Sequence, residues 1–185
     1  MKTIHITLSI LCATFIFSCK DKEAPLIPNE EELITTLSYT LTNDSTSATS
    51  VFTFTDLDGD GGNSPVLVLD SLESNSSYSG QIGLLNETED PAENILLEVL
   101  EEELDHQFFY STTASEVNID YTDFDANGNP IGASTKLITG SVGSGSLIIT
   151  LRHQPDKSAT GVSDGDITNA GGESDIEVTF PVVIQ

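Results

Sequence analysis

The chain has 185 residues, of which 30 are Asp or Glu and only 6 are Lys or Arg, so its formal net charge is −24 at pH 7. This charge argues against nucleic acid as a partner, because contacts to phosphates need cationic side chains, and against adsorption to anionic lipid. It favours cations and basic partners instead.

The N-terminus is similar to a bacterial lipoprotein signal. Lys2 precedes an apolar run over residues 4–17, which is the pattern of a secretory signal. The run is shorter than the roughly 20 residues that a membrane-spanning helix needs. Because Ile16-Phe17-Ser18-Cys19 resembles a lipobox, we expect residues 1–18 to be removed and Cys19 to be lipidated. Ordinary signal cleavage, with Cys19 incidental, is the alternative.

Residues 19–32 are expected to form a flexible tether between the lipid and a single domain over residues 33–185. They have mixed charge, two prolines and little apolar content, a composition typical of flexible chain ends. Cys19 is the only cysteine after the signal, which leaves neither an internal disulfide nor a cysteine metal site. The charged run Lys20–Glu23 resembles the export signals of surface lipoproteins. We therefore expect a lipid anchor in the outer membrane with the domain on the cell surface; the periplasmic face is the alternative.

The pattern of residues in this domain is mainly β. Alternating or β-branched segments separated by Gly, Asn, Asp, Ser and Pro clusters predict strands and turns, and about eight of them predict a single immunoglobulin-like β-sandwich. We expect these strands at 33–42, 51–55, 66–69, 78–85, 107–112, 117–122, 147–152 and 175–184.

One segment, near 92–105, predicts a short helix. Pro91, early acidic residues and a run rich in Leu and Glu are typical of a helix start, and Asp90 is a candidate cap. The helical repeat places four leucines on one face, namely Leu96, Leu97, Leu100 and Leu104. A strand that continues to Tyr110 is the alternative.

Two acidic loops resemble each other and are candidate Ca²⁺ sites. Oxygen ligands at alternate positions before a Gly are how a tight loop surrounds Ca²⁺. The twelfth positions, Leu67 and Ser134, lack the glutamate that an EF-hand requires, so another part of the fold would have to complete each site. Turns without metal are the alternative. The candidate ligands are Asp56, Asp58 and Asp60 in the first loop and Asp123, Asp125 and Asn127 in the second.

The histidines suggest a second candidate metal site. Glu102 and His106 are four residues apart, so they share a face if the helix extends that far, and His153 is the only other histidine after the signal. Two histidines and a glutamate are a possible ligand set for a transition metal. Histidines that only pack or form hydrogen bonds are the alternative.

Two further features have less specific patterns. Residues 154–174 are rich in Gly and Asp and are long for a loop in a compact domain, which is typical of functional loops; a mobile loop, or a short strand near Val162, is the alternative. The triplets beginning at Asp44 and Asp70 resemble O-glycosylation sites of exported Bacteroidetes proteins, with Ser45 and Ser71 as the acceptors.

From Glu30 onward the chain resembles a group of small Bacteroidetes outer-membrane lipoproteins of unknown function. Members are sometimes labelled type 1 periplasmic-binding-fold proteins, but that fold needs two α/β lobes, and this chain is too short and has one predicted helix. The resemblance implies no functional residues. The segments that carry it are 31–36, 56–62, 84–87, 102–109 and 165–173.

The sequence contains no nucleophile elbow, zinc-protease motif or phosphate-binding loop. We therefore expect a non-enzymatic envelope lipoprotein that captures a ligand or docks on a membrane partner. A TonB-dependent outer-membrane receptor is one such partner. The alternative function is a structural or adhesion domain on the cell surface that Ca²⁺ stiffens.

Overall fold

The computed structural model describes residues 33–59, 61–114 and 116–185, which belong to a compact unit that spans Glu31–Gln185. The predicted signal peptide, Cys19 and the tether lie outside the described residues, as does Asp60. Within the described part of the chain, no helix has the length and apolar character needed to cross a membrane.

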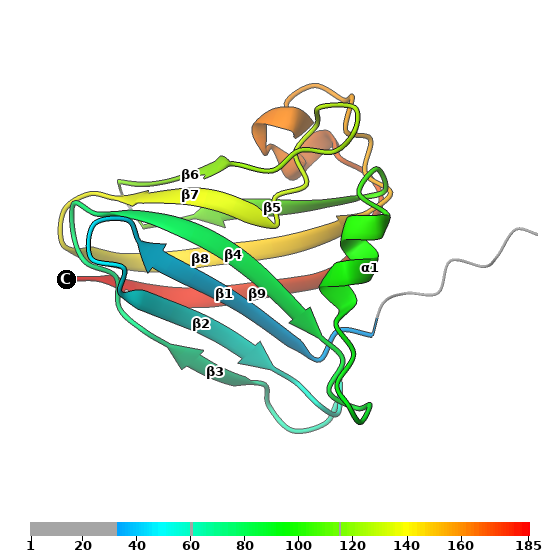
Figure 1. Ribbon diagram of the computed structural model, residues 1–185, viewed down its shortest axis with the longest axis horizontal. Helices are drawn as coiled ribbons and strands as arrows, with labels where there is room; N and C mark the ends of the chain where they lie inside the picture. The colour runs from blue at the N-terminus through cyan, green and yellow to red at the C-terminus, as the bar shows by residue number, and fades with distance from the viewer. Residues whose placement is uncertain (1–32, 60, 115) are drawn as a thin grey trace, which may run out of the picture. The chain divides into compact units, whose positions relative to one another are not determined.

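Two antiparallel sheets form a sandwich (Figure 1), which confirms the predicted mainly β architecture. The structure has nine strands rather than about eight. The six-stranded sheet has the order β3-β2-β1-β4-β7-β6 and the smaller sheet the order β5-β8-β9. The strand bounds are β1 Thr36–Asn43, β2 Thr49–Thr55, β3 Val66–Leu69, β4 Ser77–Leu85, β5 His106–Thr112, β6 Val117–Tyr121, β7 Ser134–Thr139, β8 Gly143–His153 and β9 Glu173–Ile184.

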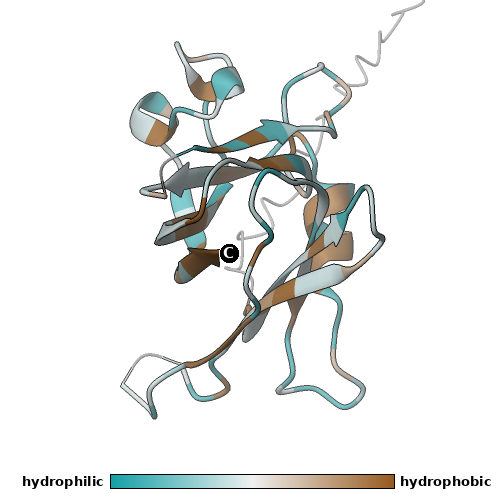
Figure 2. Cartoon of the chain, turned by 90° about the vertical axis from the view of Figure 1, so that its left-hand side faces the viewer, coloured by the Kyte–Doolittle hydropathy of each residue, from teal (hydrophilic) through white to brown (hydrophobic). Residues whose placement is uncertain are grey.

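Both sheets contribute alternate side chains to one hydrophobic core. Along β1, Leu37, Tyr39 and Leu41 are fully buried, as the two-residue period of a strand dictates. The rings of Phe52 in the larger sheet and Phe180 in the smaller one lie 5.9 Å apart. Figure 2 shows hydrophobic residues on the strands and on the helix, whereas the loops are mostly hydrophilic. The described residues of this core come mainly from both sheets and from α1.

The strand that the sequence did not predict is β7. Its buried positions include Thr135 and Thr139, while Ile138 is exposed. The hydroxyl groups of these threonines have partners: Thr135 pairs with the Tyr39 hydroxyl, and Thr139 donates to the Glu73 carbonyl. Because polar residues face the core and an apolar residue faces outward, the alternation that identifies a strand is hidden.

The predicted helix is present as α1, Ile95–Glu101, and crosses one end of the sandwich (Figure 1). It is shorter than expected, and its N-cap is Asn94 rather than Asp90. The predicted leucine face is wrong, because Leu97, Leu100 and Leu104 are exposed and Leu96 is only partly buried. The buried residues are Ile95 and Val99, one turn apart on the side that faces β4.

The long loop before β9 is folded against the outer face of the smaller sheet. It contains two short 3₁₀ helices, at Val162–Asp164 and Ile167–Asn169, so the strand considered near Val162 is absent from the described loop. Val162 and Ala170 pack with Phe109 of β5 in a second, smaller apolar cluster. The loop is therefore a packed layer of the domain.

Candidate metal centre

Two histidines meet at one end of the smaller sheet. His106 begins β5 and His153 ends β8, and they are direct cross-strand partners. Their rings are stacked, with centroids 4.6 Å apart and planes 13° from parallel. Residues two apart in a strand lie on the same face. His106 therefore shares a face of β5 with buried Phe108, and His153 shares a face of β8 with buried Leu151, so both rings face the interior.

A β-bulge adds Asp175 to this pair. Leu151 pairs with Ile176 and Arg152 pairs with Ser174, which makes Asp175 the extra residue on β9. A bulge redirects one side chain, and bulges are frequent beside functional sites. Here the Asp175 side chain is only 2% exposed and faces both rings, with 3.8 Å from its Oδ2 to Nε2 of His106 and 3.9 Å from its Oδ1 to Nδ1 of His153.

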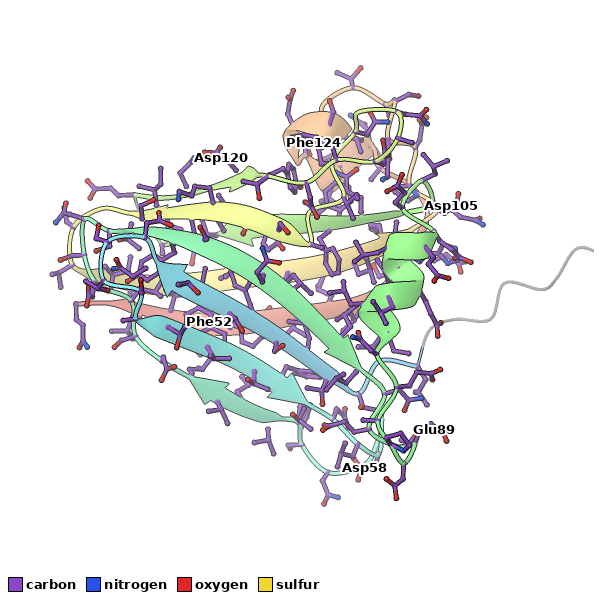
Figure 3. The ribbon with its side chains drawn as sticks, viewed as in Figure 1. Phe52, Asp58, Glu89, Asp105, Asp120 and Phe124 are labelled. Carbon is purple, nitrogen blue, oxygen red and sulfur yellow. The ribbon has the colours of Figure 1, made fainter. Side chains whose placement is uncertain are left out.

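Glu102 joins the group from the other side. It is the residue that follows α1, so the helix does not extend to His106 as the spacing argument required. The chain instead turns directly into β5, and Nδ1 of His106 lies 3.2 Å from the Glu102 carbonyl oxygen. Ligand atoms of Glu102, His106 and His153 all lie within 4.8 Å of one another. Figure 3 shows the neighbouring Asp105 where α1 gives way to β5.

The tautomer of His106 leaves one ring nitrogen available to bind a metal. Because a carbonyl only accepts, Nδ1 carries the proton in its contact with Glu102, which leaves the lone pair on Nε2. Nε2 is buried and has no hydrogen-bond partner among the residues that the structure describes. Burial lowers the pKa of His106, which favours the neutral imidazole that metals bind.

The separations also suit a metal. Both distances to Asp175 are too long for hydrogen bonds. Two ligands about 2.1 Å from one tetrahedral ion would lie roughly 3.4 Å apart. For Asp175 this is a contraction of about 0.5 Å; the ligand atoms of Glu102, His106 and His153, which lie within 4.8 Å of one another, would close by up to about 1.4 Å. Two imidazoles and two carboxylates form a ligand set suited to Zn²⁺ and similar divalent transition metals.

The sequence therefore identified three of the four members of this centre: Glu102, His106 and His153. It missed Asp175, which is one of 30 acidic residues and has no distinguishing motif. Its inward direction depends on the bulge, and the strand pattern gave no sign of that bulge.

A cleft of about 590 Å³ has Asp175 among its lining residues, whereas His106, His153 and Glu102 do not line it. It lies where the described domain begins, and Asp175 forms part of its wall together with Leu33, Phe54, Asp58 and Glu177. Asp175 is thus the one member of the centre that borders this cleft. The acidic residues of its lining give the cleft a negative potential that attracts cations.

In the first acidic loop the carboxylates accept hydrogen bonds from residues of the same turn. Asp56 Oδ1 accepts from the backbone N–H groups of Asp58 and Gly59, and Asp58 Oδ2 accepts from the backbone and side-chain nitrogens of Asn63. These are the short-range bonds of Asx turns. They favour the turn alternative for Asp56 and Asp58, and a Ca²⁺ site at this loop stays a prediction.

In the second acidic loop a lysine lies beside the carboxylate of Asp125. The Nζ of buried Lys157 is 3.0 Å from Asp125 Oδ2 and also donates to the carbonyls of Glu103 and Pro130. Asp125 Oδ1 accepts from the N–H of Asn127, and Asp123 accepts from the N–H groups of Gly132 and Ser134. Lys157 thus provides the positive charge that Ca²⁺ would supply, which favours the turn alternative here too.

The two candidate glycosylation residues differ in access. Ser45 is exposed in the turn after β1. Ser71 is half-buried, and its hydroxyl accepts a hydrogen bond from Gln185. Ser45 is therefore the better placed of the two for modification.

Comparison of the chain with family models, with curated proteins and with solved structures gave no match.

Proposed function

We propose that this protein is a non-enzymatic binding module of the bacterial envelope, and that it captures a divalent transition-metal ion between His106, His153, Asp175 and Glu102. The observation that carries the proposal is the buried Nε2 of His106, which lacks a hydrogen-bond partner among the described residues and faces a carboxylate at 3.8 Å. A buried polar atom without a partner costs about 1–3 kcal/mol, and a metal ion would remove that cost.

The composition of the centre supports binding rather than catalysis. Four protein ligands fill a tetrahedral ion, whereas a catalytic zinc keeps one position open for water or substrate. His106 and Asp175 are almost completely buried, so a substrate has little access to the ion. Lipidation at Cys19 would hold the module in the outer membrane, where a TonB-dependent receptor is a fitting recipient of captured metal.

The test is Zn²⁺ titration of the chain from residue 20 onward, by calorimetry and thermal melting, after removal of metal with EDTA. We expect one equivalent to bind. Zinc at 100 times its Kd should stabilise the protein by about 2.7 kcal/mol. His106→Gln and Asp175→Asn should abolish the shift in melting temperature, and Glu102→Gln should weaken binding.

Glu101→Gln is the matched control, because Glu101 is an exposed acid one residue from Glu102 and outside the group of ligands. It should bind zinc like the parent protein. A parent protein that does not bind zinc, or a His106→Gln variant that binds equally well, would refute the proposal.

The alternative, a structural or adhesion domain stiffened by Ca²⁺, has its own test. It expects Ca²⁺ to raise the melting temperature and Asp58→Ala or Asp125→Ala to abolish the rise. The hydrogen bonds in both loops speak against it, because the carboxylates already have partners.

A further inference from the structure

The larger sheet ends in an edge strand with an unusual surface. Strand β3 pairs with β2 on one side and has no strand partner on the other among the described residues. Val66, Leu67 and Val68 are 60%, 41% and 61% exposed. Since neighbouring side chains point to opposite faces, both faces of this strand present aliphatic groups to solvent. The strand lies at the lower margin of the sheet in Figure 1.

The hydrogen-bond pattern directs backbone groups outward from β3. Asp56 N–H donates to the Thr35 carbonyl and Asp70 N–H donates to the Val51 carbonyl. Hydrogen-bonded pairs alternate along an antiparallel ladder, so Val66 and Val68 direct their backbone groups to β2. The N–H and C=O of Leu67 therefore point away from the sheet, where another extended chain can pair with them.

Edge strands of soluble proteins normally carry protection against pairing, such as a lysine, an inward charge, a proline or a bulge. The residues of β3 are Val, Leu, Val and Leu and include none of these; its protection is its length of four residues. Pro65, immediately before the strand, has the same outward parity as Leu67 and lacks an N–H, so the open part of the edge is limited to Leu67 and Leu69. The exposed edge is thus suited to addition of a strand from a partner.

The charge beside the edge indicates what kind of partner fits. At the start of β3 a hollow of about 250 Å³ is lined by Val66, Leu57, Asp56 and Asp58. Hydrogen bonds from Asn63 lower the pKa of Asp58, so this carboxylate is ionised at neutral pH. Figure 3 shows Asp58 at this end of the sheet. A lysine or arginine next to an extended apolar segment matches the hollow.

We infer that β3 is a docking edge for an extended segment of a partner protein, with apolar residues at alternate positions and Lys or Arg at the end that meets Asp56 and Asp58. A second copy of this chain fits less well, because each copy carries a net charge of −24 and would bring the same acidic hollow to the contact. The inference does not depend on metal binding.

The test uses a library of short synthetic peptides, flanked by lysines, with Val, Ile, Phe or Tyr alternating with Thr. Binding to the chain from residue 20 is measured by fluorescence anisotropy in EDTA, so that zinc has no part in the result. We expect saturable binding that weakens with salt. Replacing the flanking lysines by glutamates, or methylating the backbone nitrogens that face β3, should weaken it at least about tenfold.

Variants of β3 locate the site. Leu67→Pro removes the outward donor but leaves the bonds of its neighbours to β2, and Val68→Lys repels the cationic peptides; each should cost about tenfold in affinity. Val142→Lys is the matched control, because Val142 is 72% exposed and lies between β7 and β8, neither of which pairs with β3; it should bind normally. Circular dichroism checks that each variant folds.

Three outcomes would overturn the inference: no peptide of the library binds, binding persists after N-methylation or in Leu67→Pro, or the protein itself dimerises through β3 in light scattering. The last outcome would assign the edge to a second copy instead.

Discussion

Replacement of Lys157 by Met should destabilise the domain, because it removes one partner of a buried ion pair. The Nζ donates to Asp125 Oδ2 at 3.0 Å and to the carbonyls of Glu103 and Pro130 at 2.6 and 3.2 Å. Removing one partner of a buried ion pair costs about 3–5 kcal/mol. Asp125 retains hydrogen bonds from the backbone N–H groups of Asn127 and Asn129, so we expect the lower part of that range or somewhat less, about 2–4 kcal/mol.

The assay is urea unfolding, with melting temperature as a second readout; the expected decrease is roughly 5–15 °C for a domain of this size. Lys136→Met is the matched control, because Lys136 pairs with Asp44 at a partly exposed position, where such pairs contribute about 0–1 kcal/mol. Equal losses in the two variants would show that burial of the Lys157 pair does not determine its contribution.

The effect should also depend on pH. Burial alone would raise the pKa of Asp125, but hydrogen bonds from Lys157 and from the loop backbone outweigh it and lower the pKa. A lowered folded pKa contributes stability above the unfolded value, about 3.9, and the contribution is lost as the pH falls through the folded pKa. The difference between Lys157→Met and the parent should therefore shrink in acid. A difference that stays constant down to the acid transition would contradict this reasoning.

Two further predictions concern the helix face and the junction between β8 and β9. Val99→Ala should cost about 2 kcal/mol because it empties a fully buried position, whereas Leu97→Ala, at a position 58% exposed, should change the free energy of unfolding by less than about 0.5 kcal/mol; urea unfolding compares the two. Gly172→Ala should cost about 2–4 kcal/mol, because its φ is +67° and a Cβ would lie 2.1 Å from the His153 carbonyl oxygen. Its neighbour Gly171 has a similar φ but open space around it, so Gly171→Ala should cost only about 1 kcal/mol.

In strands such as β1 and β4 the predicted alternation coincides with burial, whereas β3 was predicted from its aliphatic run although none of its residues is fully buried. Strand β3 has the predicted bounds, and β4 begins one residue earlier than predicted. Strand β7 was missed because Thr135 and Thr139 are buried through hydrogen bonds to distant residues, which local pattern cannot reveal. The helix was predicted from its composition, but its buried face was not. The leucines suggested one face, whereas the residues that pack toward β4 are Ile95 and Val99.

Local sequence pattern also predicted the candidate metal centre only in part. The spacing of Glu102 and His106 suggested proximity through a helix, and they are close for a different reason, because the helix ends and the chain turns. His153 was included because histidine is rare in this chain. Asp175 depends on strand register and on one extra residue in β9, and both are tertiary properties.

Two successive carbonyls at the end of α1 connect the candidate metal centre to the Lys157 pair. The Glu102 carbonyl accepts from His106, and the Glu103 carbonyl accepts from Lys157. Lys157→Met would free the Glu103 carbonyl and loosen the turn that fixes Glu102 and His106. We therefore expect this variant to bind zinc about three- to tenfold more weakly in calorimetry, less than the roughly 10–100-fold for loss of a group that contacts a metal ligand directly, while Lys136→Met binds normally. Unchanged zinc affinity in a folded Lys157→Met protein would show that the two buried centres are independent, and the ordering of His106 would then rest on β5 and β8 alone.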